Sequence, residues 1–284
     1  MHSNSESCDI RPTPAAEPFV SVVTVSLNAV ATIGDTIASV SLQKTDFPVE
    51  HICVDGGSTD GTRELIDRWA ARSARLIRIY EPDSGIYDAM NKGLLAARGE
   101  YVLFLNADDF FVAPETLGTA LANLSPGASD NPDLVLGDVA MGEIGLWGVW
   151  RRRRVPRLLE RLRGCGLYPL HQGQLTKRSM LNAIGGFDAR LRYSSDVIQY
   201  YDLERRFRPS MRFVDTDVAF MRAGGAVNAG WSVRYRATLE FYAHLASTYS
   251  RRRAAVMVGV KTLQSLAEVR WGRCPHKRWF ADAV

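Results

Sequence analysis

Residues 100–111, E-Y-V-L-F-L-N-A-D-D-F-F, join an uninterrupted apolar run to two adjacent carboxylates. The run Tyr101–Leu105 is typical of a parallel strand covered on both faces, where few side chains other than Val, Leu and aromatics fit. In an open parallel sheet, ligands bind just outside the carboxyl ends of the strands. Asn106, Asp108 and Asp109 are therefore predicted to lie at a ligand-binding edge.

Two neighbouring carboxylates repel each other until a cation or a proton compensates the charge. Mg²⁺ and Mn²⁺ are hard cations that bind one or two carboxylates together with the phosphate oxygens of a substrate. The alternative is that Asp108 and Asp109 only cap the next turn, which is a common position for Asp. This loop by itself leaves both interpretations open.

Three further apolar runs precede this strand, and each ends in a polar loop. The predicted strands are Val20–Leu27, His51–Val54 and Leu76–Tyr80, with helices expected over residues 31–42, around 65–69 and over 86–98. Alternating strands and helices predict a three-layer α/β/α domain with a parallel sheet. Asp55, Asp83 and Asp108 each follow one of these strands, so we expect them at the same edge of the sheet.

The composition is that of an ordinary globular chain, with 284 residues, 46% hydrophobic residues and a net charge of +4. Such a chain can bury one large core, and nothing in its charge predicts a nucleic-acid partner. The four cysteines are far apart and match no metal-ligand spacing, so a reducing compartment is expected. Residues 1–18 are polar and lack a stretch of signal-peptide type, which predicts a disordered tail and a cytoplasmic protein.

Four segments carry a family resemblance through their order and spacing. They are V-S-V-V-T-V-S-L-N (20–28), V-D-G-G-S-T-D-G-T (54–62), E-P-D-S-G-I-Y-D-A-M-N-K-G (81–93) and F-L-N-A-D-D (104–109). Together they resemble family 2 glycosyltransferases of the GT-A fold, and they are similar to bacterial enzymes of exopolysaccharide and glycolipid synthesis, including the colanic acid type. The resemblance spans Phe19–Asn228. It implies inverting transfer from a nucleotide-diphosphate sugar, with a divalent metal, Mn²⁺ or Mg²⁺, bridging the diphosphate.

The resemblance also implies roles for individual residues on the donor side. Asp55 would bind the nucleobase and Asp83 would line the nucleotide pocket. The first carboxylate of the family's D-x-D pattern is replaced here by Asn106, so Asp109 is the preferred direct metal ligand, with Asp108 on the sugar or ribose and at the metal end of the site. The predicted nucleotide-sugar-binding residues are Asn28, Asp55, Asp83, Asn91, Lys92 and Asp108.

Residues 113–230 are expected to form the acceptor half of a domain whose donor half is 19–112. Within it, Asp196 matches the position of the family's catalytic base, because an inverting transfer needs a carboxylate to take the proton of the acceptor hydroxyl. Asp202 is the rival for this role. His171-Gln172 is a candidate for the substrate pocket, and Trp147 and Trp150 either stack on sugar rings or pack as ordinary aromatics.

Two further segments have two interpretations each. The glycine-rich stretch 222–230 is either a loop that closes on the donor or a plain surface turn. Residues 231–284 are predicted to be a helical extension, with Val256, Val260, Leu263, Ala267 and Trp271 on one helical face and Lys261 opposite. With Arg251–Arg253 beside it, this stripe suits a helix bound to the inner face of an anionic membrane, and packing against the catalytic domain is the alternative.

The sequence therefore predicts a metal-dependent inverting glycosyltransferase of hexosyltransferase type. Its acceptor would be a glycan or a lipid-linked molecule of bacterial polysaccharide or glycolipid synthesis. The alternative is a nucleotide- or carbohydrate-binding module that keeps the fold and has lost the chemistry. Release of a nucleoside diphosphate from a sugar donor distinguishes the two.

Overall fold

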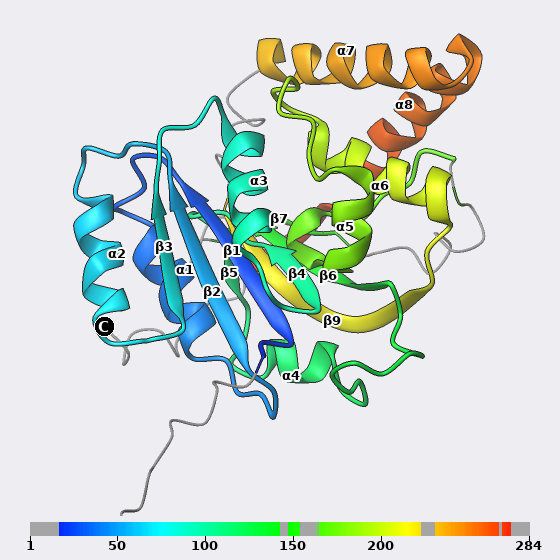
Figure 1. Cartoon of the computed structure of the whole chain (residues 1–284). Coiled ribbons are helices and arrows are strands. Elements are labelled where there is room, and N and C mark those ends of the chain that lie inside the picture. The colour runs from blue at the N-terminus through cyan, green and yellow to red at the C-terminus, as the bar shows by residue number, and fades with distance from the viewer. Residues whose placement is uncertain are drawn as a thin grey trace, which may run out of the picture.

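The computed structural model describes residues 17–142, 147–153, 163, 165–222, 231–266 and 269–273. They form a mixed ten-stranded sheet with helices on both faces (Figure 1). The first elements are β1 (Val20–Ser26), α1 (Ile33–Ser41), β2 (Val49–Asp55), α2 (Thr62–Ala70), β3 (Leu76–Tyr80), α3 (Ile86–Ala96) and β4 (Tyr101–Phe104). Then follow β5 (Phe110–Phe111), α4 (Thr116–Ala120), β6 (Leu134–Gly142), β7 (Trp147–Arg153), the 3-10 helix η2 (His171–Gly173), β8 (Gln174–Lys177), α5 (Arg178–Ile184), α6 (Ser195–Phe207) and β9 (Met211–Arg222). The chain continues with α7 (Trp231–Thr248), α8 (Arg251–Leu266) and β10 (Val269–Arg273).

The predicted α/β architecture of the first half is confirmed. Strands β3, β2, β1 and β4 are neighbours and parallel, as βαβ connections require. Because side chains of a strand alternate between faces, Val22 packs on one side of β1 and Val23 on the other. Helices α3 and α5 cover the Val23 face, and α1 and α2 cover the opposite one (Figure 1).

Helix α3 lies unusually close to the sheet. A Cβ added at Gly93 would lie 2.3 Å from Cγ1 of Val23, so only glycine permits this approach of the helix to β1. The close packing places the start of α3 beside the ends of β1 and β2. The first turn of α3 is thereby held at the edge where the polar loops were expected.

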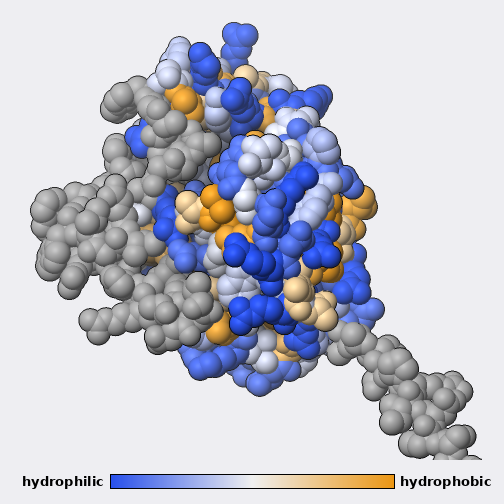
Figure 2. Space-filling view, turned by 90° about the vertical axis from the view of Figure 1, so that its left-hand side faces the viewer, coloured by the Kyte–Doolittle hydropathy of each residue, from blue (hydrophilic) through white to orange (hydrophobic). Residues whose placement is uncertain are grey.

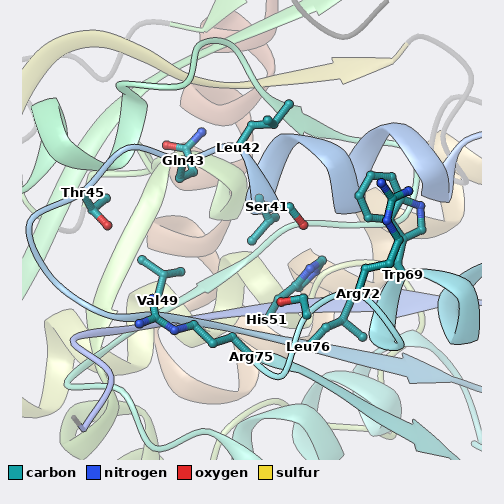
Figure 3. A pocket seen from close by; sticks show the side chains of 12 residues that line it. Ser41, Leu42, Gln43, Thr45, Val49, His51, Trp69, Arg72, Arg75 and Leu76 are labelled. Atoms are coloured by element: carbon teal, nitrogen blue, oxygen red, sulfur yellow. The ribbon is translucent and has the colours of Figure 1, made fainter. Parts of the chain in front are cut away.

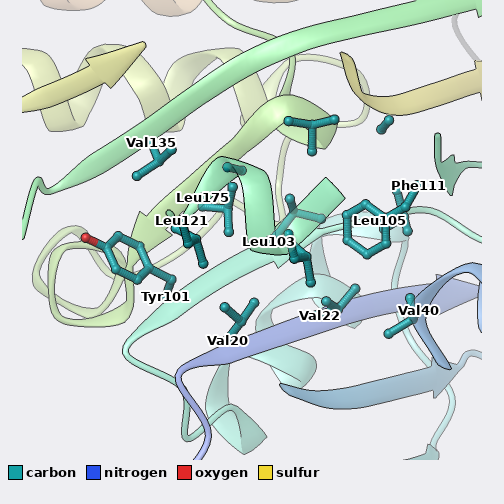
Figure 4. Packing of buried hydrophobic residues seen from close by; sticks show 14 of the residues in the cluster. Val20, Val22, Val40, Tyr101, Leu103, Leu105, Phe111, Leu121, Val135 and Leu175 are labelled. Carbon is teal, nitrogen blue, oxygen red and sulfur yellow. The ribbon is translucent and has the colours of Figure 1, made fainter. Parts of the chain in front are cut away.

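The second half of the domain extends the same sheet. Strand β8 runs antiparallel to β4 and to β6, and β9 runs parallel to β6 and antiparallel to β5. The predicted short strand 134–136 is longer, since β6 continues to Gly142. One apolar cluster joins the halves, because it contains Leu103 and Leu105 together with Val135 of β6 and Leu175 of β8. Figure 4 shows Leu103 beside Leu175. The two halves therefore share a core.

The C-terminal helices are packed on the domain. Phe241 of α7 and Met257 of α8 are buried against Tyr200 and Tyr201 of α6, and α7 and α8 lie beside α6 in Figure 1. Helix α8 packs on the domain through Ala254 and Met257, which are buried, whereas Val256 and Leu263 of the predicted stripe are exposed. Lys261, predicted on the far side, lies over the ring of buried Phe241 at 4.2 Å from its centroid.

The prediction that residues 231–284 are helical was wrong at Trp271. This residue lies in β10, which pairs antiparallel with β7. An edge strand such as β7 offers unpaired backbone groups, and a strand from the end of the chain satisfies them. The division into a domain 19–230 and an extension 231–284 stays a prediction.

Some predictions lie outside the described residues. These are the tail over residues 1–16 and the glycine-rich segment 223–230, and the side chains of Trp147 and Trp150 likewise.

At the edge of the sheet opposite to β10, strand β3 is protected by charge, since Arg78 forms an ion pair with Asp67 of α2 at 2.9 Å. Figure 2 shows the side of the molecule turned toward α2, where hydrophilic side chains mix with smaller hydrophobic areas.

Candidate active site

The loops that follow β1 and β2 are joined by side-chain hydrogen bonds. The backbone N–H of Asn28 donates to Oγ of Ser58 at 2.7 Å, and Oδ1 of Asn28 accepts the N–H of Thr59 at 3.0 Å. Asn28 has a positive φ of 51°, a conformation that Asn tolerates better than most residues. Asn28 therefore shapes this edge, and its predicted contact with a nucleotide sugar stays a prediction.

Asp55 is buried and surrounded by donors. Its carboxylate accepts the N–H groups of Gly57 at 3.1 Å and Ser58 at 2.9 Å, and Nε of Arg63 at 2.7 Å. Burial pushes the pKa of Asp55 upward, but these hydrogen bonds outweigh it and hold the pKa below its usual value. The ionised carboxylate thus organises the loop. Its predicted contact with a nucleobase stays a prediction, and the side chain has no exposed surface for it.

Asp83 comes from the next loop and lies against the loop of Asp55. A Cβ added at Gly56 would meet Oδ2 of Asp83 at 1.9 Å, so the glycine leaves the space that this carboxylate occupies. Lys92 of α3 lies on the same side, with Nζ 2.5 Å from the carbonyl oxygen of Pro82 and 3.7 Å from Asp88. Lys92 therefore contacts the loop that carries Asp83, through the carbonyl oxygen of the preceding residue.

Asn91 faces a different neighbour. Its amide exchanges two hydrogen bonds of 2.8 Å with the backbone N–H and C=O of Phe187, in the loop between α5 and α6. The side-chain amide of Asn91 thus pairs with the backbone of Phe187 as two neighbouring strands pair in a sheet, and it links α3 to the α5–α6 loop. The geometry gives Asn91 a structural role, and its predicted contact with the nucleotide sugar stays a prediction.

Asp108 and Asp109 have different surroundings although they are adjacent. Asp109 is 1% exposed, its Oδ2 accepts Nε2 of Gln172 at 2.9 Å, and its Oδ1 is buried without a hydrogen-bond partner. Burial, followed by repulsion from Asp108, raises the pKa of Asp109 well above its usual value. Asp108 is half-buried. Asp108 is therefore the more accessible of the two carboxylates, and the predicted preference for Asp109 as the direct metal ligand stays a prediction.

The donor set beside Asp108 fits a divalent cation shared with a diphosphate. Oδ1 of Asn106 is buried without a hydrogen-bond partner and adds an oxygen of the kind that Mg²⁺ and Mn²⁺ prefer. Within the described part of the chain, no group of three or more His, Cys, Asp or Glu side chains is arranged to hold a metal. Few protein ligands suit a cation whose other ligands are phosphate oxygens and water.

Asp196 in the first turn of α6 receives two hydrogen bonds from distant segments. The hydroxyl of Tyr87 donates to Oδ1 at 2.9 Å, and Nδ1 of His171 lies 3.2 Å from Oδ2. The other ring nitrogen, Nε2, lies 3.4 Å from Nδ2 of Asn106. Because that amide nitrogen is a donor, the geometry assigns the ring proton to Nδ1, which donates to Asp196. One chain of contacts thus links the loop after β4 to Asp196.

The charge state of Asp196 follows from these partners. Burial, the largest influence, pushes its pKa upward, but the hydrogen bonds of His171 and Tyr87 and the positive charge of Lys261 together hold the pKa below its usual value. The pKa of Tyr87 is raised by its own burial and by this carboxylate, so it stays a donor. With its side chain 18% exposed, Asp196 is an ionised carboxylate that a small group can approach.

The rival carboxylate lies elsewhere. Asp202 is six residues further along α6 and forms an ion pair with Arg205 at 3.1 Å. The structure brings Asp196, and not Asp202, into contact with His171. The sequence analysis did not predict Tyr87 as a partner of Asp196. Tyr87 belongs to the segment 81–93 that carries the family resemblance, and this membership could have marked it as a candidate site residue.

A cavity of about 510 Å³ lies away from this site. It opens where β2 and β3 begin and is lined by the ends of α1 and α2, with His51, Trp69 and Arg75 among its side chains (Figure 3). None of the predicted site residues lines it. The candidate site is instead the polar edge at the carboxyl ends of β1 to β4.

Comparison with known proteins identifies the family. The model of glycosyl transferase family 2 matches residues 21–198. A PGL/p-HBAD biosynthesis glycosyltransferase of Mycobacterium tuberculosis is 35% identical over 184 residues, which are 64% of this chain and 68% of that protein. TuaG of Bacillus subtilis, a putative teichuronic acid biosynthesis glycosyltransferase, is 44% identical over 94 residues, which are 33% of this chain and 37% of that protein.

Solved structures show the same fold at low sequence identity. The mannosyltransferase PcManGT of Pyrobaculum calidifontis, in complex with GDP-Man and Mn²⁺, matches with a TM-score of 0.59 and 21% identity over 91% of this chain and 73% of that one. Residues 1–349 of Staphylococcus aureus TarS, in complex with UDP, match with a TM-score of 0.57 and 19% identity over 86% and 70%. The parallel sheet, the polar edge and these matches lead to one conclusion: the chain belongs to glycosyltransferase family 2 and has the GT-A fold.

Proposed function

We propose that the protein transfers a hexosyl group with inversion from a nucleotide-diphosphate sugar to a hydroxyl of a glycan or lipid-linked acceptor. The observation that supports this most is the Asp196 carboxylate, ionised, partly exposed and hydrogen-bonded to Tyr87 and His171. In a displacement with inversion, the acceptor oxygen attacks the anomeric carbon as the bond to the diphosphate breaks. Asp196 takes the proton of that hydroxyl, which is general base catalysis.

His171 and Tyr87 prepare Asp196 for this step. Both donate to the carboxylate, so they orient its two oxygens and keep it unprotonated. A base works best when its geometry is fixed before the substrate arrives. Because His171 also contacts Asn106, the base and the donor loop are held in one arrangement.

On the donor side, we propose that Asp108 and Asn106 hold Mg²⁺ or Mn²⁺ and that the loops of Asn28, Asp55 and Asp83 receive the nucleotide. When bound, the cation neutralises the diphosphate and stabilises it as a leaving group. The similar archaeal mannosyltransferase was solved with GDP-Man and Mn²⁺ and TarS with UDP, which supports a nucleotide-sugar donor here. The neighbouring Asp109 is held in place by a hydrogen bond from Gln172.

We also propose that the protein works at the cytoplasmic face of a membrane as a peripheral protein, on an acceptor of glycolipid or polysaccharide synthesis. Two similar proteins are named for such syntheses. In α7 and α8, the exposed apolar side chains Tyr235, Leu239, Val256 and Leu263 accompany exposed Arg251 and Arg252. Apolar and basic side chains together suit an anionic lipid surface. No helix among the described residues is long and apolar enough to span a membrane.

The test is a panel of UDP-, GDP- and dTDP-sugars with Mn²⁺ or Mg²⁺, read by thermal stabilisation and by release of nucleoside diphosphate. The proposed transferase is stabilised by one donor class only with metal present, and releases the diphosphate when acceptor lipid is added. A module that only binds would be stabilised and release nothing. Absence of both responses across the panel would refute the proposal.

A further inference from the structure

The loop that leads into α6 is held by a residue of the C-terminal helix α7. The carboxylate of Glu240 accepts the backbone N–H groups of Arg192 at 2.8 Å, Tyr193 at 2.8 Å and Ser194 at 3.0 Å. In addition, Oγ of Ser194 donates to the backbone carbonyl of Ala237 at 3.1 Å. Three amide donors on one carboxylate make a strong, charge-assisted set of hydrogen bonds.

The contact lies immediately before the start of α6. Ser194 is the N-cap residue of α6, yet its side chain makes no capping hydrogen bond within the helix. Of the three amides that Glu240 accepts, that of Ser194 belongs to the N-cap residue, and those of Arg192 and Tyr193 lie in the loop before it. A carboxylate close to a helix start also interacts favourably with the helix dipole. Asp196, the candidate base, lies in the same first turn. Glu240 thus holds the backbone two residues before that carboxylate.

Helix α7, which carries Glu240, and the neighbouring α8 both pack on the domain. Phe241, next to Glu240, is 0% exposed, and a Cβ added at Gly166 would lie 2.6 Å from the carbonyl oxygen of Met257 in α8. Nζ of Lys261 lies 4.2 Å from the ring centroid of Phe241 and 5.6 Å from that of Tyr168. Because these contacts pack α7 closely on the domain, the position of the Glu240 backbone is fixed relative to the 192–194 loop.

We infer that Glu240 is a positioning residue for sugar transfer, which holds the 192–194 loop and through it the Asp196 carboxylate in place for the acceptor hydroxyl. The inference rests on the proposed function in one respect only, the assignment of Asp196 as base. It gives the C-terminal helices a part in the active site in addition to any contact with lipid. Small displacements of a catalytic group cost large factors in rate, so the effect appears in turnover.

The experiment compares Glu240→Ala and Glu240→Gln with wild type, and uses Glu64→Ala as the control, since Glu64 is exposed on α2 on the other side of the sheet. We expect Glu240→Ala to lower kcat by about 10²-fold while the KM for the sugar donor stays near wild type. Glu240→Gln keeps one carbonyl oxygen and therefore retains part of the activity. Should Glu240→Ala fail to fold, as judged by its melting curve, Glu240→Gln carries the same comparison.

Hydrogen exchange gives a readout that needs no turnover. Loss of the acceptor should speed exchange at the amides of Tyr193 and Ser194 in Glu240→Ala, to a smaller extent in Glu240→Gln, which keeps one acceptor oxygen, and should leave Glu64→Ala unchanged. Unaltered exchange at these amides, or a wild-type kcat in Glu240→Ala, overturns the inference. If the wild-type chain transfers no sugar from any donor, the proposed function fails, and the exchange data still decide whether Glu240 holds this loop.

Discussion

Nδ1 of His171 lies 3.2 Å from Oδ2 of Asp196, and this contact joins two segments that are 25 residues apart in the chain. It gives the carboxylate a donor at the place where burial alone would favour its protonated form. The proposed base is therefore ionised because of its neighbours, and its chemistry can be altered through them.

The role of Asp196 is tested by Asp196→Asn, which keeps the shape of the side chain and removes its ability to accept a proton. We expect kcat to fall by about 10²–10⁴-fold, the usual range for a lost general base, with the affinity for the donor nearly unchanged. Steady-state kinetics and calorimetric binding of the nucleotide sugar measure the two quantities. Asp202→Asn is the control and should be close to wild type, and the reverse pattern would reassign the base to Asp202.

The influence of His171 appears in the pH dependence. In His171→Ala, burial of Asp196 is opposed only by Tyr87 and Lys261, so the pKa of Asp196 rises. Since the base loses activity as it becomes protonated, the acid limb of the kcat profile moves to higher pH. Initial rates from acidic to neutral pH measure the shift. His244→Ala removes a histidine of α7 as the control, and a limb that stays in place in His171→Ala would contradict the proposed pairing.

The metal assignment is tested by comparing Asp108→Asn with Asp109→Asn. We expect Asp108→Asn to lose the stabilisation by donor that depends on Mn²⁺, because the reachable carboxylate has gone. Asp109→Asn should retain it, since a buried amide can still accept the hydrogen bond from Gln172. Melting temperatures with donor, with and without Mn²⁺, give the answer. If only Asp109→Asn loses the metal response, then Asp109 is the direct ligand after all.

Membrane binding is tested by point substitutions, because removing α8 would also remove Ala254 and Met257 from the core. Arg251→Ala and Arg252→Ala should each weaken binding to anionic liposomes at low salt by about 1 kcal/mol, roughly fivefold. Sedimentation with liposomes measures this, and higher ionic strength should release the wild type. Arg68→Ala on α2 is the matched control and should bind normally. Equal binding to neutral and anionic vesicles would count against the charged surface.

Much of the fold could be predicted from the sequence because its signals are local. Apolar runs such as Tyr101–Leu105 show where strands are buried on both faces, and the polar residues after them show which edge receives a ligand. That edge is a property of parallel strands, so Asp55, Asp83 and Asp108 could be placed together without knowledge of the packing. The family pattern depends on the same loops.

The tertiary structure decided the orientation of individual side chains and the residues that they contact. Asp109 faces Gln172 and leaves Asp108 accessible, Lys261 turns inward onto Phe241, and Glu240 reaches a loop 48 to 46 residues away. None of this follows from periodicity, because each orientation depends on a partner that is distant in the chain. Burial and pKa are likewise set by those partners. The sequence by itself predicted at which edge of the sheet the candidate site lies, and long-range packing determined which of its carboxylates is buried, which is half-buried and which has hydrogen-bond donors that hold its pKa low.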